Sequence, residues 1–157
     1  KQYAMIIVTQ SDAEGDGVDS NGNVNMTGGT LVVFGPQGGG NGALDYAGTF
    51  NVSGGTMLAL GSAGMAQSVT GTDSVKVYAY NYSQQPDILS AVTDKEGEII
   101  IAFRNPKAFQ TMVLASDKIS GDSECTLYQG GSMDTQDENG VWLDGKYTPG
   151  TQIGVLS

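Results

Sequence analysis

Two stretches of this sequence repeat each other at a constant spacing of 26 residues. Residues 17–35 contain GVDSNG and then GGTLVVFG, and residues 43–61 contain ALDYAG and then GGTMLALG. Asp19 and Asp45 occupy equivalent places in the two copies. A period of roughly 20–50 residues is typical of folds in which repeated units stack on one another. The repeat therefore predicts that equivalent residues of the two copies lie side by side.

Inside each copy, apolar side chains alternate with polar ones. Val24 and Met26 alternate with asparagines in the first copy, and Phe50 and Val52 alternate with polar residues in the second. This alternation is typical of short β-strands, and glycine pairs and turn sequences separate the strands. Short strands without helices between them predict an all-β fold, a parallel β-helix. Its coils are expected to stack about 4.7–4.9 Å apart.

The repeat also extends beyond the two copies. Backward, the spacing of 26 aligns residues 5–8 with residues 31–34, so residues 1–14 form the second half of an earlier coil. Forward, Gln67 aligns with Asp45 if the preceding loop is four residues shorter. The sequence therefore predicts about three coils in total.

The earliest coil lacks its first half, which leaves an open end of the β-helix. Solenoid proteins normally cap such ends, and bare strand edges recruit other chains. A truncated or processed chain is the simpler explanation, and stacking on a second subunit to form a homo-oligomer is the alternative. The same alignment places Ile6, Val32 and Leu58 in one outward-facing apolar ladder. We expect residues 72–157 to cover this ladder.

From residue 72 onward the pattern changes. Residues 88–92 and 99–103 flank the turn sequence DKEG, which predicts a β-hairpin. Further strands are expected at residues 75–79, 110–115 (where periodicity alone also allows a helical turn) and 125–128, with one or two more within 141–156. We therefore predict parallel β-helix coils over residues 1–71. An antiparallel sheet or sandwich over residues 72–157 is expected to pack on them.

The charge of the chain limits its partners. Seventeen acidic and seven basic residues give a net charge of −10. This argues against binding to nucleic acid or to an anionic membrane surface, and it permits cations and neutral ligands. No apolar run approaches the roughly 18 residues of a membrane span, so membrane insertion is not expected. Cys125 is the single cysteine, which excludes a disulfide within the chain.

Stacked carboxylates form the best candidate site. In a parallel β-helix, strand spacing brings Asp19 and Asp45 within about 5 Å of each other. Two ionised carboxylates this close repel unless one takes up a proton or a cation lies between them. Calcium accepts such irregular sets of oxygen ligands. The predicted calcium ligands are Asp16, Asp19, Asn21, Asn41, Asp45 and Gln67. The alternative is that these side chains only cap turns.

Catalysis has little support in the sequence. The chain has no histidine, and no basic residue lies between residues 2 and 75. A β-helix polysaccharide lyase needs a base beside its calcium ion, and the coils of the ladder contain none. A glycosidase needs one carboxylic acid kept protonated, whereas a shared metal ion would hold Asp19 and Asp45 ionised. Cys125 lacks a base partner. We therefore expect no enzymatic activity and no catalytic residues.

Several motifs resemble those of a family of secreted bacterial carbohydrate-binding proteins, whose founding member is a clostridial polygalacturonate- and cellulose-binding protein. The motifs are GDGVDSNGNVNMTGGTLVVFGP, NGALDYAGTFNVSGGT and GSAGMAQ in the first part of the chain, and AFQ and CTLYQGG in the second. The resemblance covers most of the chain. It implies a right-handed parallel β-helix like that of pectate lyases, with calcium in the coils and no lyase activity.

The coils that precede this stretch in the family are absent here, so family sites on those coils do not carry over. The resemblance supports Asp16, Asp19 and Asp45 as calcium ligands and leaves the sugar-binding residues unassigned, with Tyr46 as a candidate for stacking on a sugar. It implies a non-catalytic, calcium-containing module that binds plant cell-wall polysaccharide, polygalacturonate or cellulose, and is secreted or held at the cell surface. The alternative is a structural cell-surface or filament subunit built from stacked β-helices.

Overall fold

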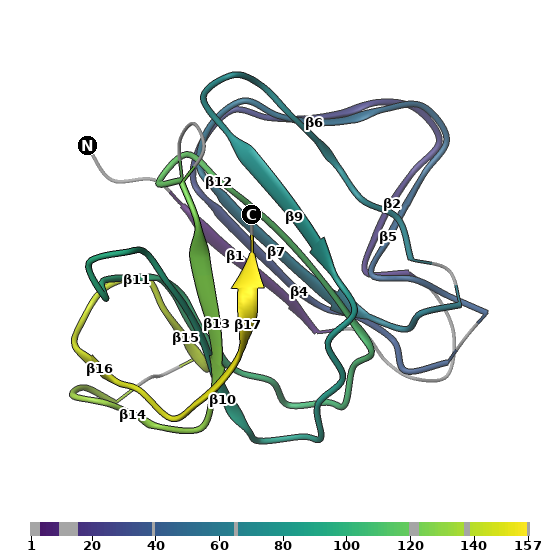
Figure 1. The fold of residues 1–157 in the computed structure, drawn as a ribbon. Helices are drawn as coiled ribbons and strands as arrows, with labels where there is room; N and C mark the ends of the chain where they lie inside the picture. Colours follow the sequence, from purple (N-terminus) through teal and green to yellow (C-terminus); the bar gives the residue numbers. More distant parts are fainter. Residues whose placement is uncertain are drawn as a thin grey trace.

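The computed structural model describes residues 4–9, 16–38, 40–64, 66–119, 123–136 and 139–156 of the chain (Figure 1). Every regular element within these ranges is a β-strand. The strands form two five-stranded sheets, one three-stranded sheet and two two-stranded sheets. The prediction of an all-β protein is therefore confirmed.

Short parallel strands make up the N-terminal part of the described chain. They are β1 (Met5–Thr9), β2 (Val18–Ser20), β3 (Val24–Met26), β4 (Thr30–Phe34), β5 (Leu44–Tyr46), β6 (Phe50–Val52), β7 (Thr56–Gly61) and β8 (Thr70–Gly71). They pair in three ladders, β1-β4-β7, β2-β5 and β3-β6-β8. Val24 lies opposite Phe50, and Leu31 lies opposite Met57. The predicted stacking of the two copies of the repeat is therefore confirmed.

Strand β1 is paired one residue out of the predicted register. Val32 lies opposite Ile7, whereas the spacing of 26 predicted Ile6. The strand bounds give the reason, because eight residues (10–17) separate β1 from β2 and nine residues (35–43) separate β4 from β5. A slip of one residue moves every side chain of a strand to the opposite face. The prediction that Ile6 belongs to the outward ladder was therefore wrong.

Strand β8 continues the third ladder beyond the point where the sequence repeat ends. Asn51 lies opposite Thr70, and Val52 lies opposite Gly71. The spacing here is 19 residues (70 − 51). A two-residue strand made of threonine and glycine has no alternation of apolar and polar residues, so no pattern in the sequence predicts it.

Antiparallel strands complete the two large sheets. They are β9 (Lys76–Tyr80), β10 (Leu89–Thr93), β11 (Ile99–Arg104), β12 (Thr111–Ser116), β13 (Cys125–Gln129), β14 (Ser132–Met133), β15 (Val141–Trp142), β16 (Tyr147–Thr148) and β17 (Thr151–Leu156). One large sheet has the order β1-β4-β7-β12-β9, and the other has the order β15-β11-β10-β13-β17. The first sheet is mixed because β12 runs antiparallel to β7. The strands therefore do not form one solenoid over the whole chain.

The strands expected after residue 72 are present, with small shifts of their bounds. The predicted hairpin is confirmed, since β10 pairs antiparallel with β11. The last segment holds three strands, β15, β16 and β17, rather than one or two, and β14 is a further strand that was not predicted. Strands β9 and β12 share a sheet with β1, β4 and β7. The division of the chain at residue 71 stays a prediction.

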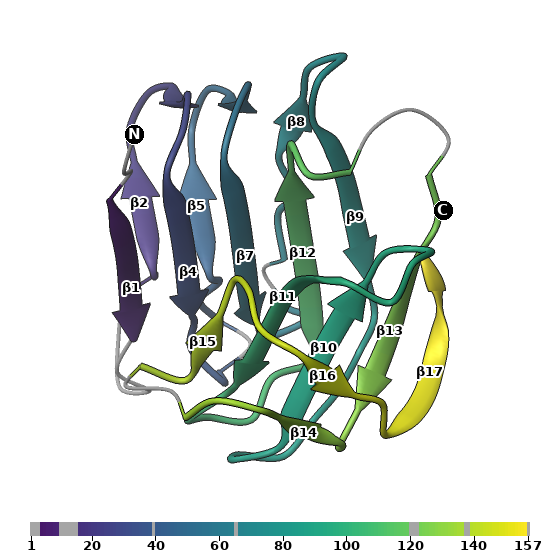
Figure 2. The same cartoon turned by 90° about the vertical axis from the view of Figure 1, so that its left-hand side faces the viewer.

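The main core lies between the two large sheets (Figure 2). Val32 and Leu58, on the first sheet, are fully buried in one cluster with Ile101 and Phe103 of the second. The expectation that the C-terminal strands cover this apolar ladder is confirmed. A second cluster, which includes Phe50, fills the space enclosed by the parallel ladders.

The glycine pair that opens each GGT motif marks where the repeats approach most closely. The second glycine of each pair has a left-handed backbone, with φ of 78° at Gly29 and 86° at Gly55. A Cβ atom on Gly55 would lie 2.3 Å from the carbonyl oxygen of Gly29. Both the conformation and the close approach favour glycine at this position.

Gly55→Ala should therefore lower the free energy of unfolding by about 2–3 kcal/mol, because it combines backbone strain with a backbone overlap. Gly97→Ala is the matched control, since Gly97 has φ of 84° but no atom near the added Cβ. We expect the control to lose only about 1 kcal/mol. Urea unfolding of both variants measures the difference. Equal losses would contradict the close stacking of the repeats.

Candidate functional site

The carboxylates of Asp19 and Asp45 lie in neighbouring strands at directly opposed positions. Strands β2 and β5 run parallel, and Asp19 is paired with Asp45 in their register. Paired residues of adjacent strands project from the same face of a sheet. Both side chains are exposed. The predicted ladder of two aspartates is therefore confirmed, and like charges at opposed positions are destabilising.

Asp16 belongs to the same group of charges. Its Oδ1 accepts a hydrogen bond from the backbone N–H of Gly42 at 2.7 Å. The pKa of Asp45 is raised above its ordinary 3.8 by loss of hydration, by repulsion from Asp16, by a hydrogen bond with Asp16 and by repulsion from Asp19. Because Asp45 is exposed and keeps most of its hydration, the neighbouring carboxylates are the more important cause. The group thus favours a bound proton or another cation at Asp45.

The three amides predicted as ligands have different surroundings. The Oε1 atom of Gln67 accepts a hydrogen bond from the backbone N–H of Tyr46 at 3.1 Å. This bond connects the segment between β7 and β8 to β5. Asn41 is half-buried, and its backbone carbonyl oxygen accepts a hydrogen bond from the Ser62 hydroxyl at 2.8 Å. Asn21 is exposed in the turn after β2. The hydrogen bond to Tyr46 places Gln67 beside the residue that follows Asp45 on β5.

The donor chemistry of the ladder suits a hard cation, although the carboxylates alone do not enclose one. Among the described residues, no three or more His, Cys, Asp or Glu side chains form a group that could hold a metal ion. Asp16, Asp19 and Asp45 supply carboxylate oxygens, which calcium prefers together with amide and backbone oxygens. A calcium site here would therefore depend on ligands other than carboxylates.

Tyr46 is less available for sugar stacking than its place in the sequence suggested. The side chain is half-buried, and its ring packs edge-on against Phe50 with centroids 5.8 Å apart. Its hydroxyl donates a short hydrogen bond to the carbonyl oxygen of Ser68. These contacts hold the ring against Phe50 and the segment that contains Ser68, and its role in sugar binding stays a prediction.

Cys125 offers no reactive thiol. The side chain is buried and free. Burial is the main cause that raises the pKa of the thiol, so the thiol stays protonated at neutral pH.

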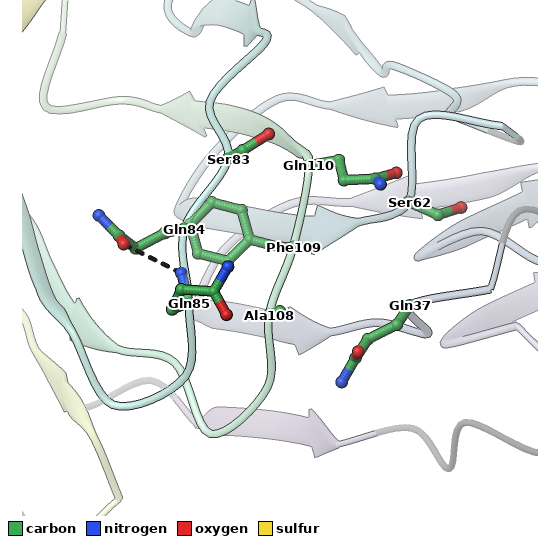
Figure 3. A pocket seen from close by; sticks show the side chains of 8 residues that line it. All are labelled: Gln37, Ser62, Ser83, Gln84, Gln85, Ala108, Phe109 and Gln110. Carbon is green, nitrogen blue, oxygen red and sulfur yellow. Dashed lines mark hydrogen bonds between the residues drawn. The ribbon is translucent and has the colours of Figure 1, made fainter.

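Sequence reasoning missed a cavity of about 300 Å³ that is lined by polar side chains around Phe109 (Figure 3). The polar side chains are Gln37, Ser62, Ser83, Gln84, Gln85 and Gln110. They come from four separate segments of the chain, so no local motif marks them. The one signal in the sequence is the number of glutamines in the connecting segments. We call this cavity the glutamine pocket.

No protein-family model matches the chain, and no curated protein or solved structure was found to match it. Within the described ranges, no helix is long and apolar enough to cross a membrane.

The charges around Asp45 predict a pH dependence of stability. A raised pKa means that the folded state binds this proton more tightly than the unfolded chain, so the resulting stability is present below the ordinary pKa of 3.8 and is lost as pH rises through the folded pKa. Asp45→Asn should therefore raise the Tm at pH 7 in the presence of a chelator. The gain should disappear under acidic conditions, where Asp45 is protonated.

Thermal melts from pH 7 down to below the ordinary pKa of 3.8 test the prediction. Asp73→Asn is the control, because Asp73 is an exposed aspartate between β8 and β9. A Tm that falls for Asp45→Asn at pH 7 without metal would contradict the repulsion between the stacked carboxylates.

Proposed function

We propose that this chain is a non-catalytic, calcium-containing module that binds plant-type polysaccharide outside the cell. The observation that carries the proposal is the opposed pair of Asp19 and Asp45, which sit at equivalent places of a repeated unit. The resemblance of its sequence motifs to those of secreted carbohydrate-binding proteins supports the proposal. Function does not follow from an all-β fold alone, so the argument depends on this site.

We further propose that the parallel ladders are coils of a right-handed parallel β-helix, to which the antiparallel strands are attached. Three observations support this interpretation. The strands of each coil follow one another without helices, their partners lie about one repeat apart, and the ladders are parallel. The enclosed cluster around Leu44 and Phe50 supplies the interior of the coils.

Calcium would be held by Asp16, Asp19 and Asp45, with amide oxygens from Asn21, Asn41 and Gln67 as further candidates. When bound, the ion would neutralise the opposed carboxylates and could accept a uronate carboxylate as an additional oxygen ligand. The protein itself would contribute position, because the backbone pairing of β2 with β5 fixes the two aspartates side by side. The absence of histidine from the sequence and of basic residues between residues 2 and 75 favours binding without catalysis.

One observation favours the second candidate function, a structural subunit that stacks on a neighbour. Strand β1 is the terminal strand of its sheet, and β2 and β3 each pair on one side only within the described residues. Met5 and Ile6 on β1 are 41% and 56% exposed. Exposed strand edges with apolar side chains are templates for pairing with another chain.

The calcium proposal predicts that a chelator weakens binding to polygalacturonate more than binding to a neutral glucan, because only the uronate has a carboxylate that needs a cation. Gel electrophoresis through each polysaccharide, with and without chelator, measures retention. Asp45→Asn should lower retention by polygalacturonate, and Asp73→Asn should not. Equal responses of both polymers would leave calcium a structural role, and no retention by either would contradict the proposed function.

The structural-subunit alternative predicts association that depends on concentration. Analytical ultracentrifugation of the full chain should then show oligomers, and Ile6→Lys should dissociate them by placing a charge on the exposed edge. Val155→Lys is the control, since Val155 is 48% exposed on β17 of the other large sheet. A monomer at all concentrations would exclude this alternative.

A further inference from the structure

The glutamine pocket holds polar groups that have no partner within the described part of the protein. Figure 3 shows the ring of Phe109 at its centre, with Ser83 and Gln85 on one wall and Gln110 on the other. The hydroxyl of Ser83 and the side-chain amide of Gln85 make no hydrogen bond to any described residue. Both side chains are exposed. They are therefore available to a ligand that enters the pocket.

The walls of the pocket are held in place by hydrogen bonds. Gln84 and Phe109 exchange two backbone hydrogen bonds, each 3.1 Å long. The side-chain Nε2 of Gln84 donates to Oε1 of Gln129 at 2.8 Å, which directs this amide away from the pocket. The Phe109 ring packs edge-on against Tyr82, with centroids 5.4 Å apart. The backbone segments that carry the polar groups are therefore held in place before a ligand binds, which lowers the entropy lost on binding.

Gln110 is oriented before any ligand binds. Its Oε1 accepts a hydrogen bond from the backbone N–H of Ala63 at 2.8 Å, and its own backbone N–H donates to the carbonyl oxygen of Gly61 at 2.8 Å. The side-chain NH₂ group makes no hydrogen bond to the described residues. With its oxygen fixed, this amide presents a donor to the pocket.

None of the described residues that line the pocket is charged, although the protein has a net charge of −10. A charged ligand would find no counter-charge there. Amides and hydroxyls both donate and accept hydrogen bonds, and sugar hydroxyls do the same. An extended peptide is favoured less, because peptides are usually held through backbone groups and those of Gln84 and Phe109 are already paired.

We propose that the glutamine pocket binds a neutral hexopyranose residue of a polysaccharide chain through Ser83, Gln85 and Gln110. The inference rests on the proposed carbohydrate-binding function and adds a second subsite to it, built from a different set of residues than the aspartate ladder. Its volume of about 300 Å³ lies at the lower end of the range for ligand pockets. This suits one sugar residue of a chain whose neighbours extend into solvent.

NMR titration of the full chain with a soluble neutral β-gluco-oligosaccharide, in the presence of a chelator, tests the proposal. The largest shifts should fall on residues 83–85 and 108–110. Gln85→Ala should weaken binding about fivefold, because it removes hydrogen bonds worth about 1 kcal/mol. The double variant Gln85→Ala/Gln110→Ala should weaken it roughly twentyfold or more. Gln152→Ala is the control, since Gln152 is an exposed glutamine on β17.

Gln85 is the decisive position, because its side chain has no partner whose loss would disturb the fold, whereas Gln110 anchors Ala63. Neutral-sugar binding that is unchanged in Gln85→Ala, with shifts elsewhere, would overturn the pocket and leave the proposed function standing. If the protein does not bind the neutral sugar but polygalacturonate still retains it in a calcium-dependent way, the pocket proposal is likewise overturned and the proposed function stands. Shifts in the pocket with an unstructured peptide and none with the sugar would assign it to a protein partner and overturn the proposal.

Discussion

Backbone hydrogen bonding between parallel strands about one repeat apart is the constraint on which the rest of the structure depends. It sets Val24 over Phe50 and Leu31 over Met57, and it brings the two corners so close that a side chain on Gly55 would meet the backbone of Gly29. The sheet formed in this way presents one face to the interior of the ladders and the other to the C-terminal strands. The core between the two large sheets and the core inside the parallel ladders therefore both depend on the register in which β4 pairs with β7.

The C-terminal strands cover the free edge of β7, the last strand of the parallel ladder β1-β4-β7. Strand β12 pairs along β7 over six residues, from Thr111 opposite Gly61 to Ser116 opposite Thr56. This pairing covers the edge that a parallel arrangement would leave bare and ends the ladder with an antiparallel strand. The opposite edge, along β1, has no such cover among the described residues. The sheet therefore ends on one side in β9, which pairs antiparallel with β12, and on the other in β1, which pairs parallel with β4. The exposed edge along β1 is the physical basis of the stacking alternative.

The sequence could predict which residues of the two repeats lie opposite each other. It could not predict features that depend on the length of a connection or on the pairing of distant segments. The opposed positions of Asp19 and Asp45 follow from the spacing of 26. The register of β1 does not, because a connection that is one residue shorter shifts Ile7 into the place predicted for Ile6. The glutamine pocket is invisible in the sequence for a related reason. Gln37, Ser62, Ser83 and Gln110 meet only after parallel and antiparallel pairing have joined four distant segments.

The aspartate ladder places like charges at equivalent positions of the two copies. Other paired positions hold residues whose stacking is favourable, such as Val24 with Phe50, or Asn25 with Asn51, whose side chains share a hydrogen bond of 3.4 Å. Asp19 opposite Asp45, with Asp16 nearby, instead places like charges together. Local conflicts in an otherwise consistent sequence concentrate at functional sites. Because an exposed position accepts many uncharged polar residues without cost, the aspartate in both copies is the physical reason for proposing that the two side chains share a cation.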